Sequence, residues 1–267
     1  MKASTSALRF SNDELCSLLG LLGPSVVIGM ANPFAGMSPN IIARNRDYSI
    51  RSLINKGLIY KIQSTNGLQI KSRKLISILK IISYPKHSVL VTTNTHQGSP
   101  RTRTFHYSEK NEIYSIEEVE TGEMLISGST QKQVYELLAS PFSKRVFMRP
   151  DDVQFPVELY EIKINSIREL VQRNKEKDAL KILLHTGVNE STAGDVLYAL
   201  CKPDINIGIA VFSNRNEIGR RVRPFGVVAY GKYLWTIEAS NQKPDTAILR
   251  QASKDKLFER FELMLPS

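Results

Sequence analysis

The segment Ile78-Leu79-Lys80-Ile81-Ile82-Ser83-Tyr84-Pro85 is followed by the run Ser88-Val89-Leu90-Val91-Thr92. Later in the chain, Val196-Leu197-Tyr198-Ala199-Leu200-Cys201-Lys202-Pro203 is followed by Asn206-Ile207-Gly208-Ile209-Ala210. The two prolines are 118 residues apart, since 203 − 85 = 118. In both places the pattern predicts an apolar helix that ends at a proline, because proline cannot continue a helix, and then a strand.

The similarity extends beyond these segments. Glu112-Ile113-Tyr114-Ser115-Ile116-Glu117 is similar to Tyr233-Leu234-Trp235-Thr236-Ile237-Glu238, at an offset of 233 − 112 = 121 residues. The order and spacing of these segments are similar in the two copies, which indicates an internal repeat, although helix–proline–strand patterns also arise by chance. We therefore expect an α+β fold with two pseudo-symmetric helix-plus-sheet halves around a central, mostly antiparallel sheet.

A proline-rich stretch, residues 139–156, predicts the division between the halves. The N-terminal half, residues 1–140, is expected to contain a helix-hairpin unit and the first helix–sheet copy. The C-terminal half, residues 141–267, is expected to contain the second copy and a closing helix.

Composition places the chain among ordinary globular proteins, with 42% hydrophobic and 23% charged residues in a length of 267. Two cysteines, Cys16 and Cys201, are too few for a disulfide framework and are typical of buried thiols in a reducing compartment. No apolar run reaches the roughly 18 residues that a membrane span needs. We expect a cytoplasmic protein without a membrane span.

Charge is the most unusual global property, with a net charge of +10 and a pI near 9.5. This balance favours acidic partners such as nucleic acid, an anionic membrane surface or an acidic protein. Between Arg44 and Lys86 the chain has ten basic residues and one acid, Asp47. A basic face that contacts only solvent is the alternative interpretation.

Motifs for catalysis are weak throughout. The segment from Gly226 to Lys232 fits a phosphate-binding loop in spacing, but Tyr233 replaces the Ser or Thr that binds magnesium. Ser-x-x-Lys matches are numerous and lack their partner motifs. The four histidines do not lie at metal-ligand spacing, and no Cys-x-x-Cys occurs. The sequence therefore predicts no catalytic residues, no metal site, no cofactor and no enzyme activity.

One binding signal lies in residues 47–71, where a helix, a strand, the Asn66-Gly67 turn and a second strand follow one another. This is the order of a winged helix, so a DNA-binding regulator is the alternative function. Helix-plus-hairpin units are also common in α+β domains that bind no DNA. The candidate nucleic-acid-binding residues are Arg51, Lys56, Lys61, Lys71 and Arg73.

A second binding signal lies near the C-terminus, where arginines precede aromatic residues on neighbouring expected strands. Arginine beside tyrosine is typical of protein interfaces, and a solvated turn is the alternative. The candidate partner-binding residues are Arg215, Arg220, Arg221, Arg223, Tyr230, Lys232 and Tyr233.

Several of these segments, taken in order, resemble the EspG family of cytosolic chaperones of type VII (ESX) secretion. The segments are Ser11-Asn12-Asp13-Glu14-Leu15 before Leu18-Leu19-Gly20, Ser52-Leu53-Ile54-Asn55-Lys56-Gly57-Leu58, Leu75-Ile76-Ser77-Ile78-Leu79 before Pro85, and Gly231-Lys232-Tyr233-Leu234-Trp235-Thr236. The resemblance implies a quasi-two-fold α+β fold without catalytic residues. It also implies a non-enzymatic cytosolic chaperone or adaptor whose partner is a secreted client protein, PE/PPE-like or another type VII substrate.

Overall fold

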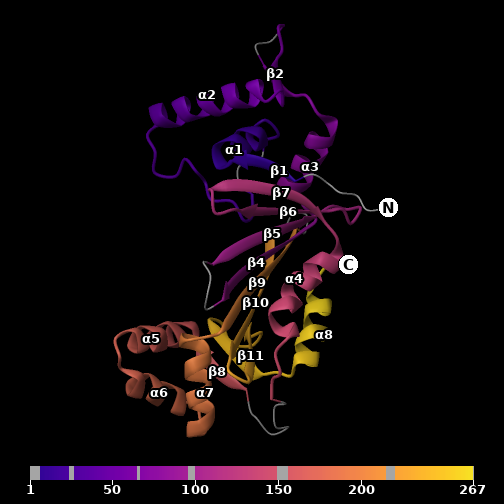
Figure 1. Ribbon diagram of the computed structural model, residues 1–267. Coiled ribbons are helices and arrows are strands. Elements are labelled where there is room, and N and C mark those ends of the chain that lie inside the picture. Colours follow the sequence, from indigo (N-terminus) through magenta and orange to yellow (C-terminus); the bar gives the residue numbers. More distant parts are fainter. Residues whose placement is uncertain are drawn as a thin grey trace.

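The computed structural model describes residues 7–23, 27–64, 67–95, 100–148, 156–214 and 220–266. In the first half of these residues, strands and helices follow one another along the chain from a short N-terminal strand (Figure 1). The elements are β1 (Leu8–Ser11), α1 (Asn12–Gly20), α2 (Pro39–Asn55), β2 (Ile59–Lys61), β3 (Leu68–Ile70), α3 (Arg73–Ser83), β4 (His87–Thr95), β5 (Arg101–Tyr107), β6 (Ile113–Glu118), β7 (Glu123–Ser129) and α4 (Gln131–Ser143).

The second half has the same succession without the small β2–β3 hairpin. Its elements are β8 (Val157–Tyr160), α5 (Glu161–Gln172), α6 (Glu176–Leu184), α7 (Glu190–Cys201), β9 (Ile205–Asn214), β10 (Arg220–Tyr230), β11 (Tyr233–Ala239), β12 (Thr246–Gln251) and α8 (Lys254–Met264).

A ten-stranded sheet connects the two halves, in the order β1-β7-β6-β5-β4-β9-β10-β11-β12-β8 among the described strands, and its neighbours pair antiparallel. The halves meet where β4 pairs with β9, and Val91 lies opposite Ile209 there. These two residues are 209 − 91 = 118 positions apart, the separation of Pro85 and Pro203. The predicted fold class is confirmed: the fold is α+β, with pseudo-symmetric halves around an antiparallel sheet. Its origin in a repeated sequence stays a prediction.

Local sequence explains the ends of the helices. Side chains that cap helix N-termini satisfy free backbone N–H groups at five starts. They are Ser11 for α1, Ser72 for α3, Thr130 for α4, Asn189 for α7 and Ser253 for α8. At the other ends, Tyr84 and Lys202 leave the helical conformation in nearly the same way, with φ −132° and −134°. Each precedes a proline, which disfavours the helical region for the residue before it.

Two boundaries differ from simple expectations. Helix α2 begins at Pro39, eight residues before the expected start at Asp47, because proline is well accommodated in the first turn of a helix. Helix α4 continues to Ser143 and contains Pro141, so the proposed division between residues 140 and 141 falls in its last turn. The division of the chain into these two halves stays a prediction. Residues 65 and 66, which belong to the expected hairpin turn, lie outside the described residues.

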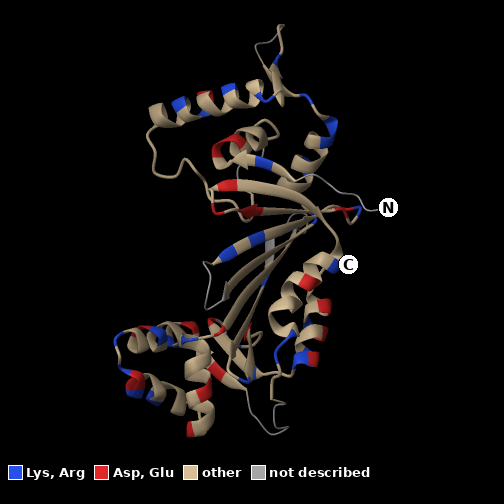
Figure 2. Ribbon diagram, in the orientation of Figure 1, with Lys and Arg blue, Asp and Glu red and all other residues tan. Residues whose placement is uncertain are grey.

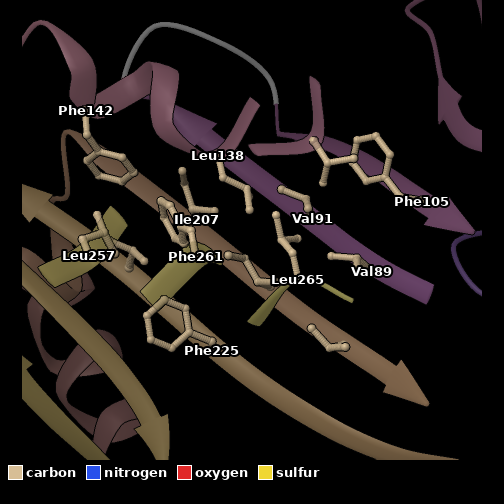
Figure 3. Close-up of a cluster of buried hydrophobic side chains, with 14 of the residues drawn as sticks. Val89, Val91, Phe105, Leu138, Phe142, Ile207, Phe225, Leu257, Phe261 and Leu265 are labelled. Carbon is tan, nitrogen blue, oxygen red and sulfur yellow. The ribbon is translucent and has the colours of Figure 1, made fainter. Parts of the chain in front are cut away.

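One hydrophobic core belongs to both halves. On one face of the sheet, α4 and α8 cover the central strands, and their Leu138, Phe142, Leu257 and Phe261 are fully or almost fully buried (Figure 3). The rings of Phe142 and Phe261 lie 6.3 Å apart between centroids. The strands contribute residues of both halves, namely Val89, Val91, Phe105, Ile207 and Phe225. The halves therefore bury their apolar surface against each other rather than folding around separate centres.

The opposite face has two further cores, one at each end of the sheet. Helices α1–α3 pack on strands β6 and β7, where Ile116 of β6 is one of the buried residues. Helices α5–α7 pack on strands β11 and β12, where Trp235 of β11 is one of the buried residues. Val227 belongs to the central core and its neighbour Val228 to the α5–α7 core. Successive strand residues point to opposite faces, so these helix groups lie across the sheet from α4 and α8.

Within the described ranges, no helix has the length and apolar character needed to cross a membrane.

Candidate functional site

In the described structure, the face opposite α4 and α8 has no helix over its central strands. The α1–α3 group lies at one end of this face and the α5–α7 group at the other (Figure 1). A hollow of about 340 Å³ lies on the face between them. Its lining includes Leu90 and Thr92 of β4, Gly208 and Ala210 of β9, Pro224 and Gly226 of β10, Ile237 and Ala239 of β11, Ala247 of β12 and Glu161 of α5. We call this surface the open face.

Small residues make the open face hollow. Gly208 pairs with Thr92 on one side and with Gly226 on the other, at the middle of the sheet. A Cβ atom added at Gly208 would meet no atom within 4 Å, whereas one at Gly226 would lie 3.2 Å from Cβ of Ile237. The floor is thus mainly apolar and shallow, with small residues on β9 and β10 between Leu90 of β4 and Ile237 of β11, which leaves space for side chains of another molecule.

Pro224 marks the end of the hollow nearest the predicted arginine cluster. Strand β10 pairs with β11 from Phe225 onward, so Pro224 lies just outside this ladder, which therefore needs no N–H from it. Residues 220–224 pair with β9 alone. Because β9 pairs with β4 on its other side, this part of β10 is an edge of the large sheet beside the open face.

The structure does not bring the predicted partner-binding residues together. Arg215 lies outside the described residues. Arg220 and Arg221 pair in backbone register with Asn214 and Ser213, and Arg223 is exposed opposite Val211. Tyr230, Lys232 and Tyr233 lie at the other end of β10. Seven residues separate Arg223 from Tyr230, which corresponds to about 23 Å along a strand. Binding by either group stays a prediction.

The tyrosines at that far end are engaged within the protein. Tyr230 stacks on Tyr198 of α7, with ring centroids 5.2 Å apart. Lys202 Nζ lies 5.7 Å from the Tyr198 ring centroid and 2.8 Å from the Glu176 carboxylate, which raises the pKa of Lys202. Sequence reasoning missed Tyr198 as a surface residue, although a tyrosine inside the apolar run 196–200 was a signal for a side chain at the edge of the core.

The candidate nucleic-acid-binding residues lie on one unit of the fold. Arg51 on α2, Lys61 on β2, Lys71 shortly before α3 and Arg73 at the first position of α3 are exposed. Lys56 instead donates to the Glu14 carboxylate at 2.8 Å, and Ser52 Oγ donates to the same carboxylate at 2.6 Å. Residues 21–38 separate α1 from α2, so the two helices are not joined by the tight turn of a helix-turn-helix. Nothing in the structure tests binding to DNA.

A buried polar pair lies under the N-terminal helices. A hydrogen bond of 3.1 Å joins His106 Nδ1 to Ser88 Oγ, and both residues are completely buried. Burial lowers the pKa of His106 to about 3, and its Nε2 has no partner among the described residues. Because neither side chain is accessible, this serine–histidine pair cannot meet a substrate.

The cysteines and the metal search add no reactive group. Burial raises the pKa of Cys16 to about 11 and also raises the pKa of Cys201, so both thiols are protonated at neutral pH. In the ranges that the structure describes, no three His, Cys, Asp or Glu side chains gather in a way that could hold a metal ion. The expectation that the protein is not an enzyme stays a prediction.

Comparisons with known proteins find similarity among solved structures. No protein-family model and no curated protein match this sequence. Among solved structures, the chain is similar to the Mycobacterium tuberculosis type VII secretion system chaperone EspG5 in complex with the PE25–PPE41 dimer. The TM-score is 0.61 and the sequence identity is 10%, over 98% of this chain and 97% of that chain. The two chains share a fold over their whole length, and membership of the EspG family stays a prediction.

Proposed function

We propose that this protein is a non-enzymatic, cytoplasmic chaperone or adaptor that binds a secreted client, PE/PPE-like or another type VII substrate, on its open face. The observation that favours this function is the hollow apolar face between two helix groups, in a fold similar to that of a chaperone solved with a bound protein dimer. The proposal gives the pseudo-symmetric scaffold a role that needs shape and apolar surface but no reactive groups.

The dimensions of the open face suit a protein segment. The lining residues come from five adjacent strands, β4, β9, β10, β11 and β12. With about 4.8 Å between strands, the floor is about 19 Å wide, enough for a helix of about 10 Å diameter with its side chains. A client that inserts apolar side chains over Gly208 and Gly226 would remove this floor and its own surface from water.

The exposed Arg223 adds a positive charge at the edge of this surface. Arg223 directly follows Val222, which is also exposed, and precedes Pro224 of the hollow. Arg220 and Arg221 lie further along the same edge of β10. In the proposal these arginines guide an acidic part of the client towards the open face, since charges at the rim mainly increase the rate of association.

A glycine substitution in the hollow tests this function. Gly208→Leu should fill the hollow while the fold persists, because its Cβ meets open space. Gly194→Leu on α7 is the matched control, since its Cβ also meets open space but lies outside the hollow. Each variant is used to capture proteins from the native host, and captured proteins are identified by mass spectrometry.

The wild type and Gly194→Leu should retain the same secreted protein, and Gly208→Leu should retain roughly tenfold less, as expected for a change at the centre of an interface. An Arg220→Glu/Arg221→Glu variant should bind the client more slowly, with a difference that shrinks at high salt. Equal capture by all variants would remove the open face as the client site.

A further inference from the structure

The positive charge of this protein is concentrated in one unit of the fold. Residues 39–86, which span α2, the β2–β3 hairpin and α3, contain ten Lys and Arg and one acid, so their net charge is 10 − 1 = +9. The rest of the chain has 36 − 10 = 26 basic and 26 − 1 = 25 acidic residues, a net charge of +1. We call residues 39–86 the basic unit.

The corresponding part of the second half is neutral. Residues 175–202, which span α6 and α7, have four lysines and four acids, a net charge of 4 − 4 = 0. There Lys181 pairs with Asp178, and Lys202 pairs with Glu176. Figure 2 shows both signs of charge over α5–α7, whereas basic residues predominate on α2. The charge of the basic unit is therefore a local property and not a consequence of a lysine-rich composition.

Most of these cations form no ion pair within the part of the chain that the structure describes. Lys56 pairs with Glu14, but eight other exposed cations of the basic unit form no ion pair with any described residue. They are Arg44, Arg46, Arg51, Lys61, Lys71, Arg73, Lys74 and Lys80. Cations this close repel one another, so the isolated protein pays a cost that an acidic partner would relieve.

The outer face of α2 combines cations with exposed apolar and aromatic groups. Ile41, Arg44, Tyr48 and Arg51 follow one another at spacings of three, four and three, so they lie on one side of the helix. Ile41 is 40% exposed and Tyr48 is 63% exposed. The opposite side of α2 packs inward through its buried Ser49 and Leu53.

We propose that the outer face of α2 binds an acidic segment of a partner protein, at a site separate from the open face. Arginine and tyrosine are the residues that contribute most at protein interfaces, and an acidic segment complements the unpaired charge. Phosphate backbones offer no apolar surface to Ile41 and Tyr48. An interfacial membrane helix needs a continuous apolar face, whereas on the outer face of α2 Ile41 and Tyr48 alternate with Arg44 and Arg51.

The test uses the full chain and a short fluorescent peptide of Glu and Asp with interspersed Leu and Tyr, measured by anisotropy. Arg44→Glu/Arg51→Glu should weaken peptide binding by roughly tenfold or more, because two close charge pairs are lost. Lys163→Glu/Lys177→Glu, two exposed positions on α5 and α6, changes the net charge equally and should leave binding nearly unchanged. Tyr48→Ala should weaken binding without affecting the fold, since this side chain is exposed.

Random duplex DNA and vesicles containing phosphatidylserine are measured with the same variants. Phosphate-driven binding falls roughly 10³-fold between about 50 and 200 mM salt, whereas binding that includes apolar contacts should fall much less. Tighter binding to DNA or vesicles than to the peptide would overturn the proposal. Equal loss of peptide binding in the α2 variant and in the α5/α6 control would also overturn it.

Discussion

The buried histidine of β5 predicts a specific pH dependence of stability. His106 lies between Ser88 of β4 and Tyr114 of β6, with no exposed surface. Burial alone lowers its pKa from 6.5 to about 3, because the interior disfavours the charged ring. The folded protein therefore keeps this ring neutral at pH values where the unfolded chain protonates it.

The magnitude follows from linkage between protonation and folding. Above about pH 6.5 the ring is neutral in both states, and His106 does not change the free energy of unfolding with pH. Below that value only the unfolded chain binds the proton, so stability falls by about 1.4 kcal/mol for each pH unit until the folded pKa is reached. Between about pH 7 and pH 5 the loss attributable to His106 is about 2 kcal/mol.

Urea unfolding followed by circular dichroism measures this loss. His106→Asn keeps a polar group near Ser88 Oγ and removes the titrating ring. The substitution lowers the free energy of unfolding by an amount that does not depend on pH, and this amount cancels when the variant is compared with itself at two pH values. The wild type should lose about 2 kcal/mol more than this variant between about pH 7 and pH 5. His185→Asn, at an exposed position after α6, should keep the wild-type dependence. Parallel pH profiles for His106→Asn and the wild type would refute the reasoning.

Two further predictions concern the N-terminal half. Glu14→Gln should destabilise the protein by about 2 kcal/mol at neutral pH in urea unfolding, because the buried carboxylate accepts from the Ser11 N–H, Ser52 and Lys56. Burial alone would raise the pKa of Glu14, but these hydrogen bonds lower it below 4.5. The stabilisation of the folded state by the Glu14 carboxylate is therefore present above pH 4.5 and is lost as the pH falls through the lowered pKa. Gly29→Ala should cost about 2 kcal/mol or more, since its φ is +84° and the new Cβ would lie 1.8 Å from Thr104 Oγ1. Gly122→Ala, with φ +75° and open space, is the control and should cost about 1 kcal/mol, so equal losses would contradict a steric role for Thr104.

The sequence was most informative where local chemistry decides the structure. The apolar runs that end before Pro85 and Pro203 predicted α3, α7 and the strands after them, because proline and capping residues act within a few positions. A capping box formed by Ser11 and Glu14 is an equally local signal, and it begins α1. Helix α2 is longer than expected at its start because Pro39 is accommodated in the first turn, and proline is compatible with both a loop and a helix start.

Features that depend on distant residues could not be predicted. Gly208, Ala210 and Gly226 form a hollow only because β9 pairs with β10 in one register, and register is a non-local property. The arginines and tyrosines near the C-terminus are close in sequence but lie at opposite ends of β10, because this strand continues for 11 residues. The concentration of charge in residues 39–86 was visible in the sequence, whereas ion pairing depends on distant residues, and most of these cations have no ion-pair partner among the described residues.

The central pairing of β4 with β9 also determines how a severed half would behave. A fragment ending after α4 would present the nine residues of β4 as an edge strand with unpaired N–H and C=O groups. Its Leu138 and Phe142 would lose the cover that α8 provides. Because β9 occupies the place that a rotated copy of β4 would take, two such fragments would associate through this edge, with Val91 opposite Val91. In the intact protein, both halves belong to one chain, so β9 is present near β4 at a high effective concentration during folding. This intramolecular pairing prevents the competing association of two β4 edges.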